Sequence, residues 1–146
     1  RFYRGRLQRV EDALAQAAEP ERFSAALTEL LSDRLSYFDM EAREPEKTYH
    51  VFVLGLLASA GIRCLSNRES GFGRYDLLAV FPDKSIVFEF KQTGEATKIG
   101  EAADEAFRQI IDRKYADGAS EGLPVYGVGI GFHNKTCAVK TAQIRK

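Results

Sequence analysis

The sequence predicts an α/β domain in which helices cover the faces of a mixed sheet. Apolar residues recur at helical spacing in residues 20–38 and 101–117. Runs rich in Val, Ile, Leu and Phe, bounded by turn residues, indicate strands at 62–65, 73–81, 85–91, 126–132 and 136–144. The resulting order, from a helix near residue 46 onward, is helix, three strands, helix, two strands, which predicts roughly five strands in one sheet. With 146 residues, 45% of them hydrophobic, the chain can bury a core of ordinary size.

The N-terminal part is expected to be a helical extension, residues 1–41, in front of a main domain at 42–146. Helices are predicted at 6–18 and 20–38, the second beginning at Pro20. The second helix carries an apolar stripe made of Phe23, Leu27, Leu30, Leu31, Leu35 and Phe38. This stripe needs a partner, which is its own core, a domain outside the chain or a second copy in a homo-oligomer. Packing on its own core is the simplest of the three.

Residues 73–91 are predicted to form an antiparallel hairpin, because Pro82-Asp83-Lys84 separates two strand-like runs. Side chains alternate between the faces of a strand, so one face carries Val87, Glu89 and Lys91, and the core-facing side carries Ile86, Phe88 and Phe90. The loop length then decides where Asp76 lies. A two-residue loop places it opposite Glu89, a four-residue loop places it opposite Lys91, and a three-residue loop turns it to the other face.

The acidic residues of this hairpin suggest a divalent metal site. Directly opposed Cβ atoms lie roughly 4.5 to 5.5 Å apart, so carboxylates at Asp76 and Glu89 would repel each other unless a cation lay between them. Magnesium prefers such oxygen ligands and usually takes one or two carboxylates. Lys91 could then orient or deprotonate an attacking water. The plainer interpretation is a solvated face or a cross-strand ion pair, contributing about 0.2 to 1 kcal/mol.

The wider sequence resembles the PD-(D/E)XK nuclease superfamily, and within it the family that usually follows an AAA-ATPase-like domain in bacterial proteins. The resemblance covers roughly residues 45 to 140. An isolated Asp followed by Glu-x-Lys is common by chance, whereas the combination of the matching runs is specific. The matching runs are Ser66 to Asp76, Val87 to Lys91, Ala106 to Ile110 with Lys114-Tyr115, and Gly127 to Phe132 with Lys135.

This resemblance implies a restriction-endonuclease-like αβββαβ core and a set of site residues. Asp76 and Glu89 would bind Mg²⁺ or Mn²⁺, Lys91 would be the catalytic lysine, and Gln109 would reach the site from its helix. Without the resemblance, Gln109 would be assigned no role, because a glutamine on the flank of a helix is usually exposed.

Two further acids are candidate metal ligands on the same grounds. Glu46 lies in the first turn of a helix expected to begin at Pro45 and to end at Gly61, where an acid is also favoured by the helix dipole. Glu69 precedes a glycine-rich turn, and its carboxylate could instead pair with Arg68 or Arg74.

The function expected from these features is a metal-dependent nuclease that hydrolyses phosphodiester bonds in DNA, with RNA also open. The alternative is a non-catalytic nucleic-acid-binding or protein-interaction module that retains the nuclease fold. The chain begins with Arg1-Phe2-Tyr3 rather than Met, which suggests a trimmed product of a longer protein. The resemblance implies that an AAA-ATPase-like domain would precede it.

Composition adds few constraints on function. The 21 basic and 21 acidic residues give a net charge of zero, so bulk charge does not indicate nucleic-acid binding. A local basic rim could still form from Arg and Lys residues within 63–114. Cys64 and Cys137 are expected to be buried free thiols in a cytoplasmic protein. No apolar run approaches the roughly 20 residues needed to cross a bilayer, so no membrane association is expected.

Residues 126–132 alternate strictly between apolar residues and glycine. Such interleaving favours a strand over a phosphate-binding loop, which needs its glycines at a strand-to-helix turn. The bare face made by Gly127, Gly129 and Gly131 is predicted to let a helix or another backbone segment approach closely.

Overall fold

The structure, a computed structural model, describes residues 10, 12–36, 45–66, 76–112 and 122–145, except for the side chains of 45 and 46. Five strands form one mixed sheet in the order β1-β2-β3-β4-β5. They are β1 Arg63–Ser66, β2 Leu77–Val80, β3 Ser85–Gln92, β4 Val125–His133 and β5 Thr136–Arg145. The central pair, β3 and β4, is parallel, and the other neighbours are antiparallel. The predicted mixed α/β sheet is therefore confirmed.

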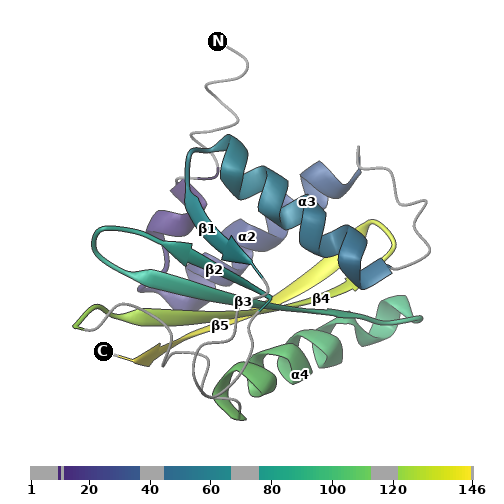
Figure 1. Ribbon diagram of the computed structural model, residues 1–146. Helices are drawn as coiled ribbons and strands as arrows, with labels where there is room; N and C mark the ends of the chain where they lie inside the picture. The colour runs from purple at the N-terminus through teal and green to yellow at the C-terminus, as the bar shows by residue number, and fades with distance from the viewer. Residues whose placement is uncertain (1–9, 11, 37–44, 67–75, 113–121, 146) are drawn as a thin grey trace.

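Helices cover both faces of this sheet (Figure 1). Helices α2 (Pro20–Leu35) and α3 (Pro45–Ser59) pack on one face, where they share a core with Ile86 and Phe88 of β3. Helix α4 (Ile99–Asp112) packs on the other face, where Ile110 meets Val87. Helices therefore cover both faces of the central strand β3.

The apolar stripe of α2 packs on the chain's own core, as the simplest interpretation predicted. Its buried members are Phe23, Leu27, Leu30, Leu31 and Leu35. Hydrogen bonds tie the helix to β5: Ser24 Oγ donates to Val139 O at 2.6 Å, Thr141 Oγ1 donates to Pro20 O at 2.9 Å, and Ser32 Oγ bonds with Cys137 Sγ at 3.6 Å. The helix ends at Leu35, earlier than expected, and residues 37 and 38 lie outside the described part. The five described residues of the stripe are therefore buried within one copy of the chain.

Helix α3 has the ends that the sequence predicts. It begins at Pro45, where a proline costs no hydrogen bond, and its last regular residue is Ser59. Gly61 follows with a φ of 77°, and Ile62 N donates back to Leu57 O at 3.1 Å. A glycine adopts this left-handed conformation without a Cβ penalty, which explains why the helix stops there.

Two expectations around α4 were wrong. The polar sequence from Thr93 to Gly100 predicts a loop, but Ala96–Lys98 forms a 3-10 turn, η1, and α4 already begins at Ile99. An ion pair between Lys98 and Glu95 at 3.0 Å spans this turn. The helical spacing also predicts an apolar side made of Ala103, Phe107, Ile110, Ile111 and Lys114. Ile111 is instead 49% exposed, and Lys114 lies outside the described residues. The helix instead buries Ala102, Ala103, Ala106 and Ile110.

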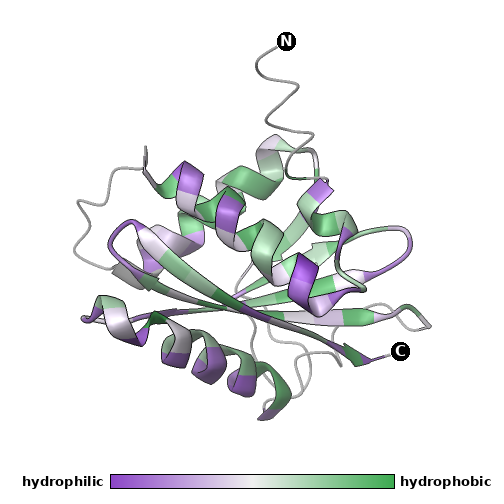
Figure 2. Cartoon of the chain, turned by 180° about the vertical axis from the view of Figure 1, so that it is seen from behind, coloured by the Kyte–Doolittle hydropathy of each residue, from purple (hydrophilic) through white to green (hydrophobic). Residues whose placement is uncertain are grey.

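The observed rotation of α4 turns its hydrophilic residues away from the sheet (Figure 2). It also turns toward the sheet the side on which Gln109 lies, because residues 102, 106 and 109 share one helical face. Across the described residues, none of the helices has the length and hydropathy needed to cross a membrane.

Both cysteines are free thiols, as predicted. Cys137 is buried, and Cys64 is partly buried against the same core. Burial raises the pKa of the Cys64 thiol to about 11 and also raises the pKa of Cys137. Neither thiol ionises readily at neutral pH, so both behave as small core residues.

Candidate active site on the central strand

The hairpin between β2 and β3 places Asp76 next to Glu89. Phe81 N donates to Lys84 O at 3.0 Å, which closes a two-residue loop at Pro82-Asp83. The ladder runs from Val80 paired with Ser85 to Leu77 paired with Phe88. Continued by one residue, it sets Asp76 opposite Glu89 on the same face of the sheet. Of the three loop lengths that the sequence left open, the structure has the shortest.

A backbone hydrogen bond fixes the Asp76 carboxylate at the edge of β3. Phe90 N donates to Asp76 Oδ2 at 2.8 Å. Because Phe90 directly follows Glu89 in β3, this bond holds the Asp76 carboxylate beside the backbone next to Glu89. Charge-assisted bonds of this kind are stronger than neutral ones and set geometry as well as energy.

Glu89 is buried, being only 7% exposed. It lies between Val87, which is fully buried, and Lys91, whose side chain is 30% exposed. The interpretation as a solvated hairpin face therefore fails for Glu89. Burying a carboxylate is costly unless hydrogen bonds or opposite charges compensate it, so the surroundings of Glu89 carry the explanation for its place.

Gln109 of α4 connects Glu89 to Lys91. With its amide oriented to suit both neighbours, Nε2 donates to Glu89 Oε1 at 3.2 Å and Oε1 accepts from Lys91 Nζ at 3.0 Å. One amide group therefore links the buried carboxylate to the ammonium. The sequence pattern alone gave this glutamine no role, and the structure brings it to the pair.

Sequence reasoning missed Glu105, which also meets Lys91. Its Oε1 lies 3.4 Å from Lys91 Nζ, and its side chain is 56% exposed. Glu105 precedes Gln109 by one helical turn, so both residues project from the same side of α4. That spacing is the signal that could have found it.

The glycines of β4 explain how α4 comes so close to the sheet. Glu89 pairs with Gly129 and Lys91 with Gly131 across the parallel ladder. A Cβ added to Gly129 would stand 2.5 Å from Ala103 O and 2.5 Å from Phe107 N, and one added to Gly131 would overlap the backbone of the same helix. The predicted close approach is confirmed, and it brings Gln109 and Glu105 of α4 within reach of Glu89 and Lys91.

On the other face of the sheet, α3 contacts the strand residues next to Asp76 and Glu89. His50 Nε2 and Ser66 Oγ lie 2.6 Å apart, and the imidazole meets the Phe90 ring edge-on at 5.9 Å between centroids. Ser66 pairs with Leu77, the residue after Asp76. Glu46 lies in the first turn of α3, but its side chain lies outside the described part, as does all of Glu69.

The two described carboxylates fit a divalent metal. Asp76, which directly precedes β2, and Glu89 of β3 offer hard oxygen donors of the kind that Mg²⁺ and Mn²⁺ prefer. The described residues include no group of three or more His, Cys, Asp or Glu side chains that could hold a metal. Magnesium often uses only one or two protein carboxylates, with water and substrate phosphate completing its shell.

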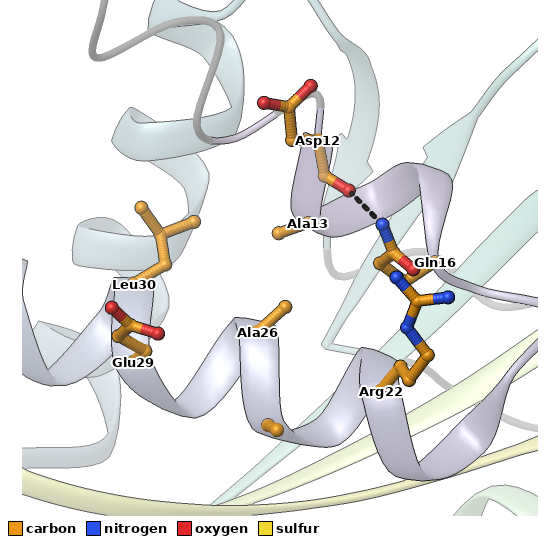
Figure 3. Close-up of a pocket in the computed structure, with 8 residues that line it drawn as sticks. Asp12, Ala13, Gln16, Arg22, Ala26, Glu29 and Leu30 are labelled. Carbon is orange, nitrogen blue, oxygen red and sulfur yellow. Dashed lines mark hydrogen bonds between the residues drawn. The ribbon is translucent and has the colours of Figure 1, made fainter.

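A separate groove of about 420 Å³ lies between residues 12–16 and α2 (Figure 3). Its polar lining residues are Asp12, Gln16, Arg22 and Glu29. Because α2 covers the face of the sheet opposite α4, this groove is remote from Gln109, and none of the predicted site residues lines it.

Comparison with known proteins identifies the family. A search of curated proteins found no match to this chain. A family model described as the PD-(D/E)XK nuclease superfamily matches residues 44–142, well over half of the chain. The match spans α3, β1 to β4, α4 and the greater part of β5, and therefore includes Asp76, Glu89, Lys91 and Gln109. The chain belongs to the PD-(D/E)XK nuclease superfamily.

Proposed function

We propose that this chain is a metal-dependent nuclease domain that hydrolyses phosphodiester bonds in DNA, with RNA as an open second substrate. The observation that carries the proposal is the buried Glu89, which faces the position of Asp76 and is joined to Lys91 through Gln109. Family membership supports nuclease chemistry in general. The arrangement of these four side chains supports the specific site.

Asp76 and Glu89 would hold Mg²⁺ or Mn²⁺. Glu46 and Glu69, whose side chains are not among those that the structure describes, are proposed as additional ligands. When bound, the ion supplies Lewis acidity to the scissile phosphate and to water. The Phe90 N–H keeps Asp76 in place, and the Gln109 amide orients Glu89. These contacts fix the two carboxylates before any substrate arrives.

Lys91 would act on the attacking water or on the phosphate. Its Nζ donates to Gln109 Oε1 at 3.0 Å, which holds the amine next to Glu89. As an ammonium, Lys91 can orient water or stabilise charge that develops on a phosphate oxygen, and only as the neutral amine could it accept a proton from water. Burial of Glu89 under α4 limits access of bulk solvent and strengthens these interactions.

The proposal includes partners that rest on the sequence alone. Nucleic acid is the substrate class, and basic residues near the site would contact its phosphates. An AAA-ATPase-like partner domain and a cytoplasmic location belong to the same proposal. Self-association through the N-terminal helices would have to use a surface other than the α2 stripe, because that stripe packs on the chain's own core. The division into an extension at 1–41 and a nuclease domain at 42–146 also stays a prediction.

Cleavage of DNA and RNA by a Glu89→Gln variant tests the assignment. The substitution keeps the size of the side chain and one acceptor oxygen for Gln109, but it removes the charge. We expect Mg²⁺-dependent cleavage to fall by about 10² to 10³-fold, the scale of losing one electrostatic contact at a reacting centre. Circular dichroism should show an unchanged fold.

Glu101→Gln is the matched control, because Glu101 is an exposed acid on α4, one turn before Glu105. It should cleave like the wild type. Full cleavage by Glu89→Gln would contradict the site. Nucleic-acid binding without metal-dependent cleavage in the wild type would favour the non-catalytic module instead.

A further inference from the structure

We propose that Glu105 is a positioning residue that holds the Lys91 ammonium in the site, a role that rests on the proposed nuclease function. Glu105 and Gln109 stand one turn apart on α4, and both present an oxygen to Lys91 Nζ, at 3.4 and 3.0 Å. The ammonium is therefore bracketed by two acceptors from the same helix.

The bracket matters because lysine is a flexible side chain. Fixing a lysine side chain costs up to about 2 kcal/mol of rotamer entropy, so a lysine with a single contact samples many positions. Two acceptors restrict Nζ to one place beside Glu89. An ammonium has three N–H donors, and the two contacts leave one to meet water or a phosphate oxygen.

Glu105 can reach Lys91 because the glycines of β4 let α4 approach the sheet closely. Lys91 pairs with Gly131, whose missing side chain lets the first turns of α4 rest against the strand. Ala102 and Ala103 lie against that glycine, and Glu105 follows them within a turn. A bulkier residue at 131 would displace the helix and carry Glu105 away from Lys91.

The geometry distinguishes a positioning role from metal binding. Glu105 is 56% exposed, whereas Glu89 is 7% exposed. The described residues do not gather three acids in any metal-binding group, so Glu105 does not join Asp76 and Glu89 as a third ligand. A partly exposed ion pair adds only about 0 to 1 kcal/mol to stability. Its effect should therefore appear in catalysis rather than in folding.

Steady-state kinetics of Glu105→Ala provide the first test. We expect kcat to fall about 5- to 10-fold while KM stays within about 2-fold, the scale for one partly exposed charge contact made through Lys91. Glu105→Gln keeps an acceptor oxygen and should recover part of the loss. Glu101→Ala, the control on the same helix, should match the wild type.

Two kinetic outcomes would overturn the proposal. A lower KM with unchanged or higher kcat would mean that Glu105 competes with the substrate phosphate for Lys91. Equal kinetics in Glu105→Ala and the wild type would mean that the contact has no role. A weakened affinity for Mn²⁺ in Glu105→Ala would also contradict the proposal, because it would make Glu105 a metal ligand.

A readout that needs no substrate separates this proposal from the nuclease assignment. Carbon–proton correlation spectra of lysine-labelled protein report whether the two Lys91 ε-protons are inequivalent, as a restrained side chain requires. The Lys91→Arg spectrum assigns the signal. We expect inequivalence in the wild type and in Glu101→Ala, and averaging in Glu105→Ala.

An unchanged Lys91 signal in Glu105→Ala would overturn the positioning role even if the enzyme is active. If the signal averages in Glu105→Ala but the wild type cleaves no nucleic acid, the contact is supported and the proposed nuclease function is refuted. The two failures are therefore distinguishable.

Discussion

The two faces of β3 differ in composition and in the way helices cover them. One face carries Ile86, Phe88 and Phe90 and packs against the apolar side chains of α2 and α3. The other carries Val87, Glu89 and Lys91 and lies beneath α4, which rests directly on the glycines of β4. Large side chains separate the helices from the sheet on the first face. Their absence from β4 on the second lets polar groups of a helix meet polar groups of the strand.

Phe90 joins the two faces. Its ring is buried on the aromatic side, 6.0 Å from the Phe132 centroid, while its backbone N–H donates to Asp76. The apolar face therefore holds the backbone that positions the acidic face. We infer that the first face mainly supplies stability and the second supplies chemistry, and substitutions on each should have separable effects.

The largest expected effect is on stability, from Phe88→Ala on the aromatic face. Phe88 is 1% exposed, and truncating a buried phenylalanine costs about 3 to 5 kcal/mol. Denaturant unfolding measures this loss. Glu89→Gln, on the opposite face, should leave the free energy of unfolding unchanged or raise it without metal, because it relieves repulsion with Asp76. Equal losses in both variants would contradict the division between the faces.

Gly129→Ala should disturb the second face by pushing α4 off the sheet. The added Cβ would meet the backbone of α4 at Ala103 and Phe107, which cannot rotate away. We expect a loss of about 1 to 3 kcal/mol in stability together with a marked drop in cleavage. Gly94→Ala is the matched control, because a Cβ there meets nothing within 4 Å. Wild-type behaviour of Gly129→Ala would refute the role of the close approach.

Gln109→Ala should affect activity more than stability. It removes both hydrogen bonds of the amide that joins Glu89 to Lys91. We expect kcat to fall at least about 10-fold, since a single hydrogen bond is worth roughly 1 to 1.5 kcal/mol. Gln143→Ala removes an exposed glutamine of β5 and serves as the control. Unchanged kcat in Gln109→Ala would remove this residue from the site.

The smallest effect is expected from the cysteines, which belong to the apolar face. Because burial raises the pKa of Cys64 to about 11, its thiol stays protonated at pH 7 to 8, and alkylation of the folded protein should be slow. Cys64→Ser should leave cleavage unchanged. Mass spectrometry after iodoacetamide treatment measures the first outcome, and rapid modification would show that the thiol is accessible and ionised.

The sequence could predict much of this arrangement because local patterns determine it. The alternation in 85–91 separates the two faces of β3, and the alternating glycines of 126–132 predict the close approach of a helix. The exact loop of the hairpin stayed open, since two- and four-residue loops both keep Asp76 on the polar face. The Phe81 to Lys84 hydrogen bond and the register of the β2–β3 ladder select the shorter loop.

The partners of Lys91 could not be predicted, because they depend on the rotation of α4 about its axis. The apolar pattern suggested a stripe through Ile111, whereas the bare glycine face of β4 favours the small residues Ala102, Ala103 and Ala106 as the contact surface. That rotation carries Glu105 and Gln109 toward the strand. It is a tertiary effect, set by glycines of β4, a strand that follows α4 in the chain.

The most direct test of the account is an isothermal titration calorimetry experiment in which Mn²⁺ is added to the wild type and to the double variant Asp76→Asn, Glu89→Gln. The account predicts saturable binding in the wild type that disappears in the double variant, while both proteins keep the same fold. Equal affinity in the two proteins, or no binding by the wild type at millimolar Mn²⁺, would contradict the claim that these carboxylates hold the ion.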